Sequence, residues 1–483
     1  MTLARSALLY AGLMGLPLLG VAAVLRAGQG LAAPPAPPAG AAVGGVLAGG
    51  GGAIPGVLLF VAQVVVVLAA ARLVGRLFRR LGQPQVVGEM AAGIFLGPSV
   101  LGWAAPGVFE LLFPAGSLGG LAVLSQVGLL LFMFLVGLEL DPGLLRGRGH
   151  TALVTSHSSI AFPFLLGVLL ALFLYPRLSD ASVGFSAFAL FMGAAMSVTA
   201  FPVIARILGE RGLLRTRLGA VTLACAAVDD VTAWCILAGV VVLARSMAEG
   251  LPLWATLVGS AAFVGAMFFV VRPLLRGLGR RYRGRGALSH DLLAVVLGVL
   301  LLAAAATEWL GVHTLFGAFV AGAVMPRDEG FVRELEGKLH DLTVVLLLPV
   351  FFAFTGLRTR LELVSGPEMW GYAALVLLVA VAGKFGGSAA AARLTGMSWR
   401  EAGALGVLMN TRGLMELVIL GIGLEIGVIS PALYAMMVLM ALATTLMTSP
   451  LLERAYPARL LAARPHAAAG EPSAGPGVLA RPA

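Results

Sequence analysis

Apolar runs about as long as a bilayer crossing recur along the chain, separated by short polar or arginine-bearing segments. A helix needs about 20 mostly apolar residues to cross a hydrocarbon core of about 30 Å. The pattern therefore predicts an all-α polytopic membrane protein, since membrane barrels show alternating segments of about ten residues instead. Thirteen core transmembrane helices are expected at residues 54–78, 84–102, 118–140, 150–175, 182–208, 214–244, 251–275, 288–310, 312–326, 342–358, 369–395, 401–427 and 431–452.

The two ends of the chain differ from this body. Residues 3–25 predict a further N-terminal helix, and the same segment also fits a signal peptide, because a Leu-Ala-Ala stretch near residue 31 resembles a cleavage region. The Pro-, Gly- and Ala-rich residues 27–53 predict a flexible linker, and the polar tail predicts disorder. The expected organisation is an N-terminal helix and linker over 1–53, a transmembrane domain over 54–452 and a tail over 453–483.

Composition agrees with a membrane protein and excludes two other classes. The chain is 59% hydrophobic and only 12% charged, against about 45–50% and 25% in soluble domains. An ordinary cytosolic enzyme and a disordered protein are both excluded. The net charge of +10 does not indicate nucleic-acid binding, because the basic residues form short clusters between apolar runs.

Those clusters also predict the orientation. With residue 54 outside, nearly all loop cations fall on the cytoplasmic side, as the positive-inside rule requires. The external loops then carry only Arg177, Arg245, Arg358 and Arg360. The loop charges predict a multi-pass membrane protein with a cytoplasmic C-terminus, and we expect the membrane to be a bacterial inner membrane.

The spans before and after the seventh resemble each other. Ala92-Gly93 precedes Gly97-Pro98 in the second span, and Ala321-Gly322 precedes Pro326 in the ninth. The fifth and twelfth spans both carry polar residues at their centres. Two inverted repeats are therefore expected, at about 54–244 and 288–452, joined by a connector at 251–275. Inverted repeats with crossed, broken helices are typical of secondary transporters, whose site lies at the midplane.

Charged residues inside the spans mark the candidate site. Asp229 and Asp230 lie twelve and thirteen residues after Arg217, about 18 Å along a helix and close to the midplane. An acid there is costly unless it is paired or hydrated, so it indicates function. Lys384 lies at similar depth in a chain whose other cations are almost all arginine. A buried lysine can release a proton, whereas arginine cannot.

Two aspartates and one lysine carry a net charge of −1, so the set can accept one monovalent cation or protons, but not both at once. We expect Asp230, Asp229 and Thr199 to bind Na⁺ or K⁺, and Lys384 to take part in the proton exchange. The alternatives are a carboxylate pair that only ties helices together and a lysine that forms only a structural salt bridge.

The broken spans supply further candidates. Pro202 removes a backbone hydrogen bond and frees upstream carbonyls that suit a cation. Arg412 and Glu416 are four residues apart and can pair on one helix face, either handling ions or neutralising helix ends. Glu89 can line a cytoplasmic funnel or pair with nearby arginines. The possible supports of the crossover are Ser197, Pro202, Asn410, Thr411, Arg412 and Glu416.

The quoted motifs resemble a known family. Thr199 to Arg206, Val228 to Val231 and Asn410 to Leu417 are similar to the monovalent cation–proton antiporter superfamily. The similarity is greatest to the branch of the Kef-type potassium systems, the NapA-like sodium–proton antiporters and the plant cation–proton exchangers, and it covers about 54–452.

The resemblance implies thirteen core helices, a homodimer and an elevator-like cycle. It implies that Asp230 is the cation and proton carrier, that Asp229 pairs with Lys384, and that exchange is electrogenic. The Kef-type regulatory nucleotide domain is not expected in this chain.

The reading is a secondary active transporter, not an enzyme: a monovalent cation–proton antiporter that takes Na⁺ first and K⁺ close behind. No cofactor is expected beyond the transported ions, and neither a P-loop nor a dinucleotide fingerprint in its proper context occurs. The alternatives are a K⁺ efflux pathway without obligatory proton exchange, a sodium-coupled organic-anion symporter of similar fold, and a non-transporting membrane sensor or assembly subunit.

Overall fold

The computed structural model describes residues 3–35, 56–114, 116–139, 149–213, 216–249, 253–285 and 287–457. Every regular element among these residues is a helix. In the first half they are α1 (Leu3–Gly28), α2 (Gly56–Arg80), α3 (Gln85–Leu96), α4 (Leu101–Ala104), α5 (Pro106–Leu112), α6 (Gly119–Glu139), α7 (Gly149–Leu178), α8 (Phe185–Ser197), α9 (Phe201–Glu210) and α10 (Arg217–Glu249).

The second half continues in the same way. Its elements are α11 (Leu253–Ala266), the π-helical turn η2 (Met267–Val271), α12 (Arg272–Arg285), α13 (His290–Trp309), α14 (Thr314–Ala323), α15 (Glu329–Leu342), the π-helical turn η3 (Thr343–Leu347), α16 (Leu348–Leu357), the short η4 (Leu361–Leu363), α17 (Gly366–Leu394), α18 (Trp399–Met409), α19 (Leu414–Glu425) and α20 (Pro431–Ala455).

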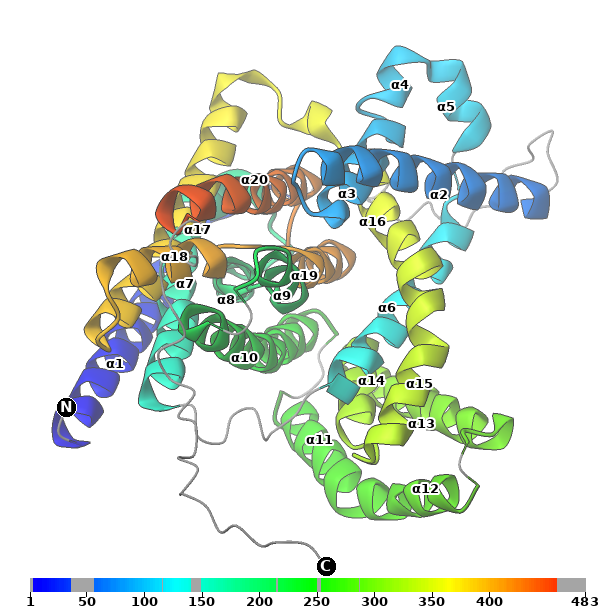
Figure 1. The fold of residues 1–483 in the computed structure, drawn as a ribbon. Helices are drawn as coiled ribbons and strands as arrows, with labels where there is room; N and C mark the ends of the chain where they lie inside the picture. Colours follow the sequence, from blue (N-terminus) through cyan, green and yellow to red (C-terminus); the bar gives the residue numbers. More distant parts are fainter. Residues whose placement is uncertain are drawn as a thin grey trace, which may run out of the picture.

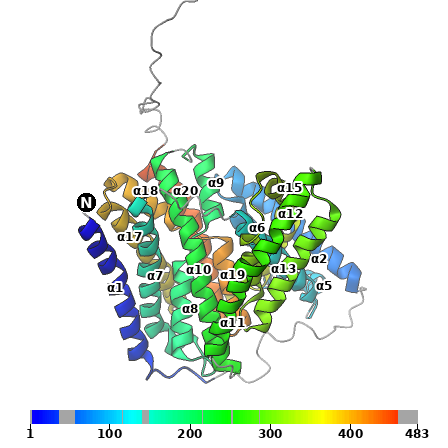
Figure 2. The same cartoon turned by 90° about the horizontal axis from the view of Figure 1, so that it is seen from below.

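The long helices stand side by side in one bundle (Figure 2). Within the described ranges, eleven helices are long and apolar enough to cross a membrane, or up to twelve if the bent pair α18–α19 is one span. The all-α, multi-pass membrane architecture predicted from the hydrophobic pattern is therefore confirmed. The number of thirteen core spans stays a prediction, because α8 and α14, at the predicted spans 182–208 and 312–326, are short apolar helices.

Two helices are interrupted near the middle of the bundle. Residues 198–200 separate α8 from α9, and residues 410–413 separate α18 from α19, which bend by 42°. The breaks lie beside each other (Figure 1), and the Ala200 N–H donates to the Thr411 carbonyl at 3.1 Å. Pro202 falls in the first turn of α9, where its missing N–H has no partner to lose. The side chain of Pro202 lies outside the described residues.

Some boundaries differ from the sequence-based expectation. The helix predicted to begin at 342 already begins at Glu329, because α15 is amphipathic and buries Phe331, Leu335 and Leu339 at four-residue spacing. A search for apolar runs misses such a helix. The connector predicted to end at 275 continues to Arg285, and α20 continues to Ala455. Most of the predicted linker, at 36–53, and most of the predicted tail, at 458–483, lie outside the described residues.

Glycines let several helices approach closely. A Cβ at Gly322 of α14 would lie 2.0 Å from the Phe134 carbonyl oxygen of α6, and a Cβ at Gly137 would lie 2.1 Å from the Phe319 carbonyl oxygen. Small residues at such contacts are the usual way for membrane helices to pack. The crossing of α6 and α14 therefore depends on these two glycines.

We expect Gly322→Ala to destabilise the protein by about 1–3 kcal/mol, because the added methyl group clashes with backbone atoms of α6. The melting temperature of the purified protein measures the effect. Gly298→Ala on α13 is the matched control, since a Cβ there meets nothing within 4 Å and alanine favours a helix. Equal melting temperatures for the two variants would contradict the close crossing.

Candidate functional site

The buried acids predicted from the sequence lie halfway along α10. Asp229 is fully buried and Asp230 is 6% exposed. Successive helix residues point about 100° apart, so the two carboxylates face different neighbours. They are surrounded by α7, by α17 and by the break between α8 and α9.

Asp229 is held by four donors. Its Oδ1 accepts the Ser156 hydroxyl at 2.7 Å. Its Oδ2 accepts the Ser159 hydroxyl at 2.5 Å, the Thr199 hydroxyl at 2.9 Å and the Lys384 Nζ at 2.9 Å. Three of these four donors meet at Oδ2, and each oxygen of the carboxylate accepts at least one hydrogen bond. Asp229 is thus a charge that is hydrogen-bonded at both oxygens at the centre of the bundle.

Lys384 completes the pair from α17. Its ammonium is fully buried, and besides Asp229 it donates to the Ser159 carbonyl at 2.9 Å. Buried ion pairs persist only where such extra hydrogen bonds meet the remaining donors. Helices α7, α10 and α17 and the α8–α9 break are therefore joined at one point.

The hydrogen-bonding environment of Asp230 differs from that of Asp229. Its Oδ1 is buried and has no hydrogen-bond partner within the described ranges. The backbone N–H of Phe201, at the start of α9, hydrogen-bonds the carboxylate, and a helix N-terminus favours negative charge. A carboxylate with a buried, unpaired oxygen is costly unless a proton or a cation joins it. The geometry leaves one acceptor open beside the closed Asp229 pair.

The predicted crossover residues separate into two groups. Thr199 reaches the ion pair, whereas the Ser197 hydroxyl donates to the carbonyls of Ile160 at 3.0 Å and Gly193 at 2.7 Å. The Thr411 hydroxyl donates to Thr448 at 3.1 Å, and the Asn410 amide donates to the Met447 sulfur at 3.9 Å. The structure places Ser197, Thr411 and Asn410 in helix contacts rather than at the two aspartates.

Arg412 and Glu416 form a second fully buried pair, 2.7 Å apart. The guanidinium also donates to the carbonyls of Ala195 and Met196 in the last turn of α8, at 2.8 Å each. A cation is favourable at a helix C-terminus and an anion in the first turn of a helix, and Glu416 lies in the first turn of α19. This arrangement agrees with the helix-end alternative.

Glu89 lies in α3, buried, and accepts a hydrogen bond from the Gln85 amide at 2.8 Å. Among the described residues it forms no ion pair within 4.0 Å. Arg72 and Arg206 nevertheless interact electrostatically with this carboxylate, so both the arginine pairing and the funnel role stay predictions.

Sequence reasoning missed Ser156 and Ser159, the two hydroxyls that α7 directs at Asp229. They lie in the polar stretch Thr155-Ser156-His157-Ser158-Ser159 inside an apolar span. Their three-residue spacing puts both on one helix face. That spacing was the available signal, although serine is common enough in membrane helices to draw no attention by itself.

Comparison with known proteins defines the class. Residues 64–454 match the family described as sodium/hydrogen exchanger, transmembrane. The fold agrees with that of the sodium proton antiporter MjNhaP1 from Methanocaldococcus jannaschii, with a TM-score of 0.61 at 17% identity over 84% of this chain and 98% of that one. This is a family of secondary transporters, not enzymes.

Proteins related in sequence indicate the same class. The chain is 46% identical to the Na⁺/H⁺ antiporter NhaS4 of Synechocystis over 80% of its own length and 95% of the relative's. It is 40% identical to the Arabidopsis thaliana cation/H⁺ antiporter 17 and 37% identical to the Saccharomyces cerevisiae K⁺/H⁺ antiporter 1, and covers 47% and 44% of those chains. The chain thus spans about half the length of these plant and yeast relatives. It belongs to the sodium/hydrogen exchanger family, within the monovalent cation–proton antiporter superfamily, as the motifs indicated.

The Asp229–Lys384 pair leads to a prediction about the stability of the protein. We expect Lys384→Met to destabilise the protein by about 3–5 kcal/mol, because it leaves a carboxylate buried without its counter-charge. The double variant Asp229→Asn/Lys384→Met removes both charges and should recover most of the lost stability. Melting temperatures of the purified variants measure both effects. Additive losses in the double variant would show that the two groups do not stabilise each other.

Proposed function

We propose that the protein exchanges a monovalent cation for protons across a bacterial inner membrane, with Asp230 holding the cation and the proton in turn. One observation carries the proposal: among the described residues the Asp230 Oδ1 is buried without a partner, while the adjacent Asp229 accepts hydrogen bonds from four donors. The open carboxylate is the group that can accept something new. The relatives named as antiporters support exchange rather than one-way efflux.

Charge explains why cation and proton compete. Asp229 and Lys384 cancel, so Asp230 alone determines the net charge of the set. An alkali cation or a proton can neutralise it in the low-dielectric interior, and either excludes the other. Alternate occupancy of one site from the two sides of the membrane is sufficient for exchange.

The number of protons exchanged for each cation depends on Lys384. As a cation binds between Asp230 and Asp229, its charge replaces that of the ammonium, and the Asp229–Lys384 pair opens. Lys384 then gives up a proton, which an arginine at this position would keep. One proton from Asp230 and one from Lys384 for each cation makes the exchange electrogenic.

The cation ligands are oxygens near the α8–α9 break. We assign the Asp230 and Asp229 carboxylates and the Thr199 hydroxyl, which already lies 2.9 Å from Asp229 Oδ2. Na⁺ is the first choice and K⁺ the second. The relative named as a Na⁺/H⁺ antiporter is 46% identical, and the relative named as a K⁺/H⁺ antiporter is 37% identical.

The wider architecture of the proposal covers residues 54–452. Thirteen core spans form two inverted repeats, at about 54–244 and 288–452, around the connector. The Ala200–Thr411 hydrogen bond between the breaks supports a crossed pair that moves as one body. Arg412 and Glu416 neutralise helix ends at this crossing. A homodimer, elevator-like motion of the core, a cytoplasmic C-terminus and a funnel lined by Glu89 complete the proposal.

The direct test is proton flux in proteoliposomes that contain a trapped pH dye. We expect Na⁺, and more weakly K⁺, to drive dye recovery in the wild type, and Asp230→Asn to abolish it. Asp341→Asn is the matched control, because the Asp341 side chain is 90% exposed.

Choline replaces the alkali cations as the blank, and gel filtration checks that each variant is folded. Alkali-driven recovery that persists in Asp230→Asn would overturn the role of Asp230. Failure of the folded wild type to respond to any alkali cation would overturn antiport itself.

A further inference from the structure

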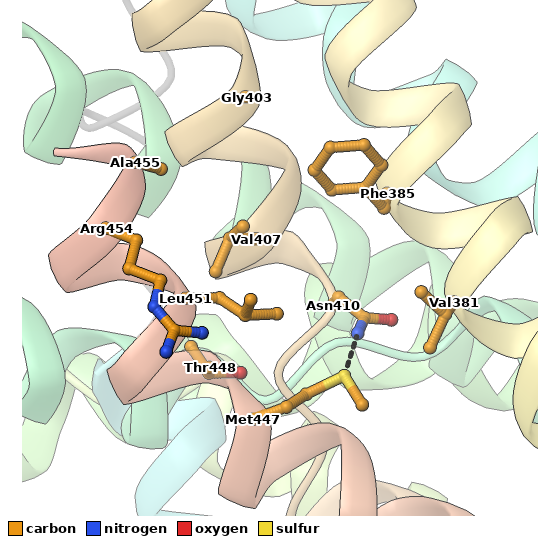
Figure 3. A pocket seen from close by; sticks show the side chains of 10 residues that line it. All are labelled: Val381, Phe385, Gly403, Val407, Asn410, Met447, Thr448, Leu451, Arg454 and Ala455. Atoms are coloured by element: carbon orange, nitrogen blue, oxygen red, sulfur yellow. Dashed lines mark hydrogen bonds between the residues drawn. The ribbon is translucent and has the colours of Figure 1, made fainter.

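A pocket of about 490 Å³ lies between α17, α18 and α20, lined by residues other than those assigned to ion binding. Its walls are apolar and include Phe385, Val407 and Leu451, as Figure 3 shows. Phe385 and Leu451 are 39% and 38% exposed on helices that cross the membrane. The volume is within the range of about 300–1,000 Å³ found for ligand sites. Part of the pocket wall therefore lies on the outer surface of the helix bundle.

One side of the pocket carries a buried amide. Asn410 is 3% exposed, and among the described residues its Nδ2 donates to the Met447 sulfur alone, at 3.9 Å. Its Oδ1 is buried and has no hydrogen-bond partner in the part of the chain that the structure describes. A thioether is a weak acceptor, and an unpaired buried amide oxygen is unfavourable. The amide therefore offers a free acceptor to an occupant of the pocket.

The other polar group is a cation. Arg454 lies in the last turn of α20, and its side chain extends back towards Thr448 and Leu451 in Figure 3. Within the part of the chain that the structure describes, its guanidinium forms no ion pair within 4.0 Å. Thr448, beside Asn410, and Arg454 lie six positions apart on α20, which separates their backbones by about 9 Å along the helix, and the Arg454 side chain spans part of that distance. The Asn410 acceptor and the Arg454 cation thus lie at different ends of the apolar pocket.

We propose that this pocket binds an amphipathic organic acid that enters from the bilayer. The acid group pairs with Arg454, the apolar body packs against Phe385, Val407 and Leu451, and a hydroxyl or N–H at the far end donates to Asn410 Oδ1. An organic cation is disfavoured by the charge of Arg454. Selectivity for an acid with a terminal donor follows from these two polar groups.

The location makes the occupant a candidate regulator. Val381 and Phe385 flank Lys384 on α17, and Asn410 is the first residue of the α18–α19 break. A bound acid contacts both elements and so fixes α17 relative to the crossing. Binding does not depend on the proposed exchange mechanism and can be measured without transport.

The test uses purified protein in nanodiscs of zwitterionic lipid, titrated with radiolabelled ω-hydroxyoctanoate or with octanoate. We expect saturable binding, with the hydroxy acid about tenfold tighter because it alone donates to Asn410. Asn410→Leu should remove that difference, and Arg454→Gln should weaken the binding of both acids. Empty nanodiscs give the background of acid dissolved in lipid.

A pair of glycines supplies the steric control. Gly403 lines the pocket and Gly386 does not, and a Cβ at either meets nothing within 4 Å. Gly403→Leu should fill the pocket and abolish binding, whereas Gly386→Leu should leave it unchanged. Absence of saturable binding in the wild type, or binding that survives in Gly403→Leu, would overturn the proposal. If Gly403→Leu does not fold, unchanged affinities in Arg454→Gln and Asn410→Leu would overturn it equally.

Discussion

A charge at the centre of a membrane bundle must be met by other polar groups, and Asp229 meets this requirement with four donors from three other parts of the chain. Ser156 and Ser159 come from α7, Thr199 from the α8–α9 break, and Lys384 from α17. Removing any one of these donors leaves buried charge less well compensated. The relative positions of these helices therefore depend on this one carboxylate.

The two helix breaks depend on the same principle. A broken helix leaves carbonyls and N–H groups without partners in a region that offers no water. Arg412 meets the carbonyls at the end of α8, and the Ala200–Thr411 hydrogen bond joins the breaks. Among the described residues, Asp230 and Glu416 each keep one buried carboxylate oxygen without a hydrogen-bond partner. Glu416 already pairs with Arg412 through its other oxygen, whereas Asp230 forms no ion pair within 4.0 Å in the described part of the chain. Asp230 is therefore the candidate site because the neighbouring charges and helix ends already have partners.

Much of this could be predicted from the sequence because charge within an apolar run is rare and costly. Depth along the helix singled out Asp229 and Asp230, and the scarcity of lysine singled out Lys384. The serines of α7 could not be ranked in the same way, because a hydroxyl can bond its own helix backbone and carries little cost in a span. The beginning of α15 was missed because an amphipathic helix breaks the apolar run. The partners of Ser197 and Thr411 depend on tertiary packing, which residue spacing does not specify.

The central claim is that cation binding at Asp230 displaces protons, and proton release on cation binding tests it most directly. Na⁺ is added to purified, weakly buffered protein in a pH-stat, and released protons are counted against bound cation. The account predicts about two protons per cation, one from Asp230 and one from Lys384, and none from Asp230→Asn. Release of a single proton would remove Lys384 from the exchange. Cation binding without proton release, or equal release from Asp230→Asn, would contradict the claim.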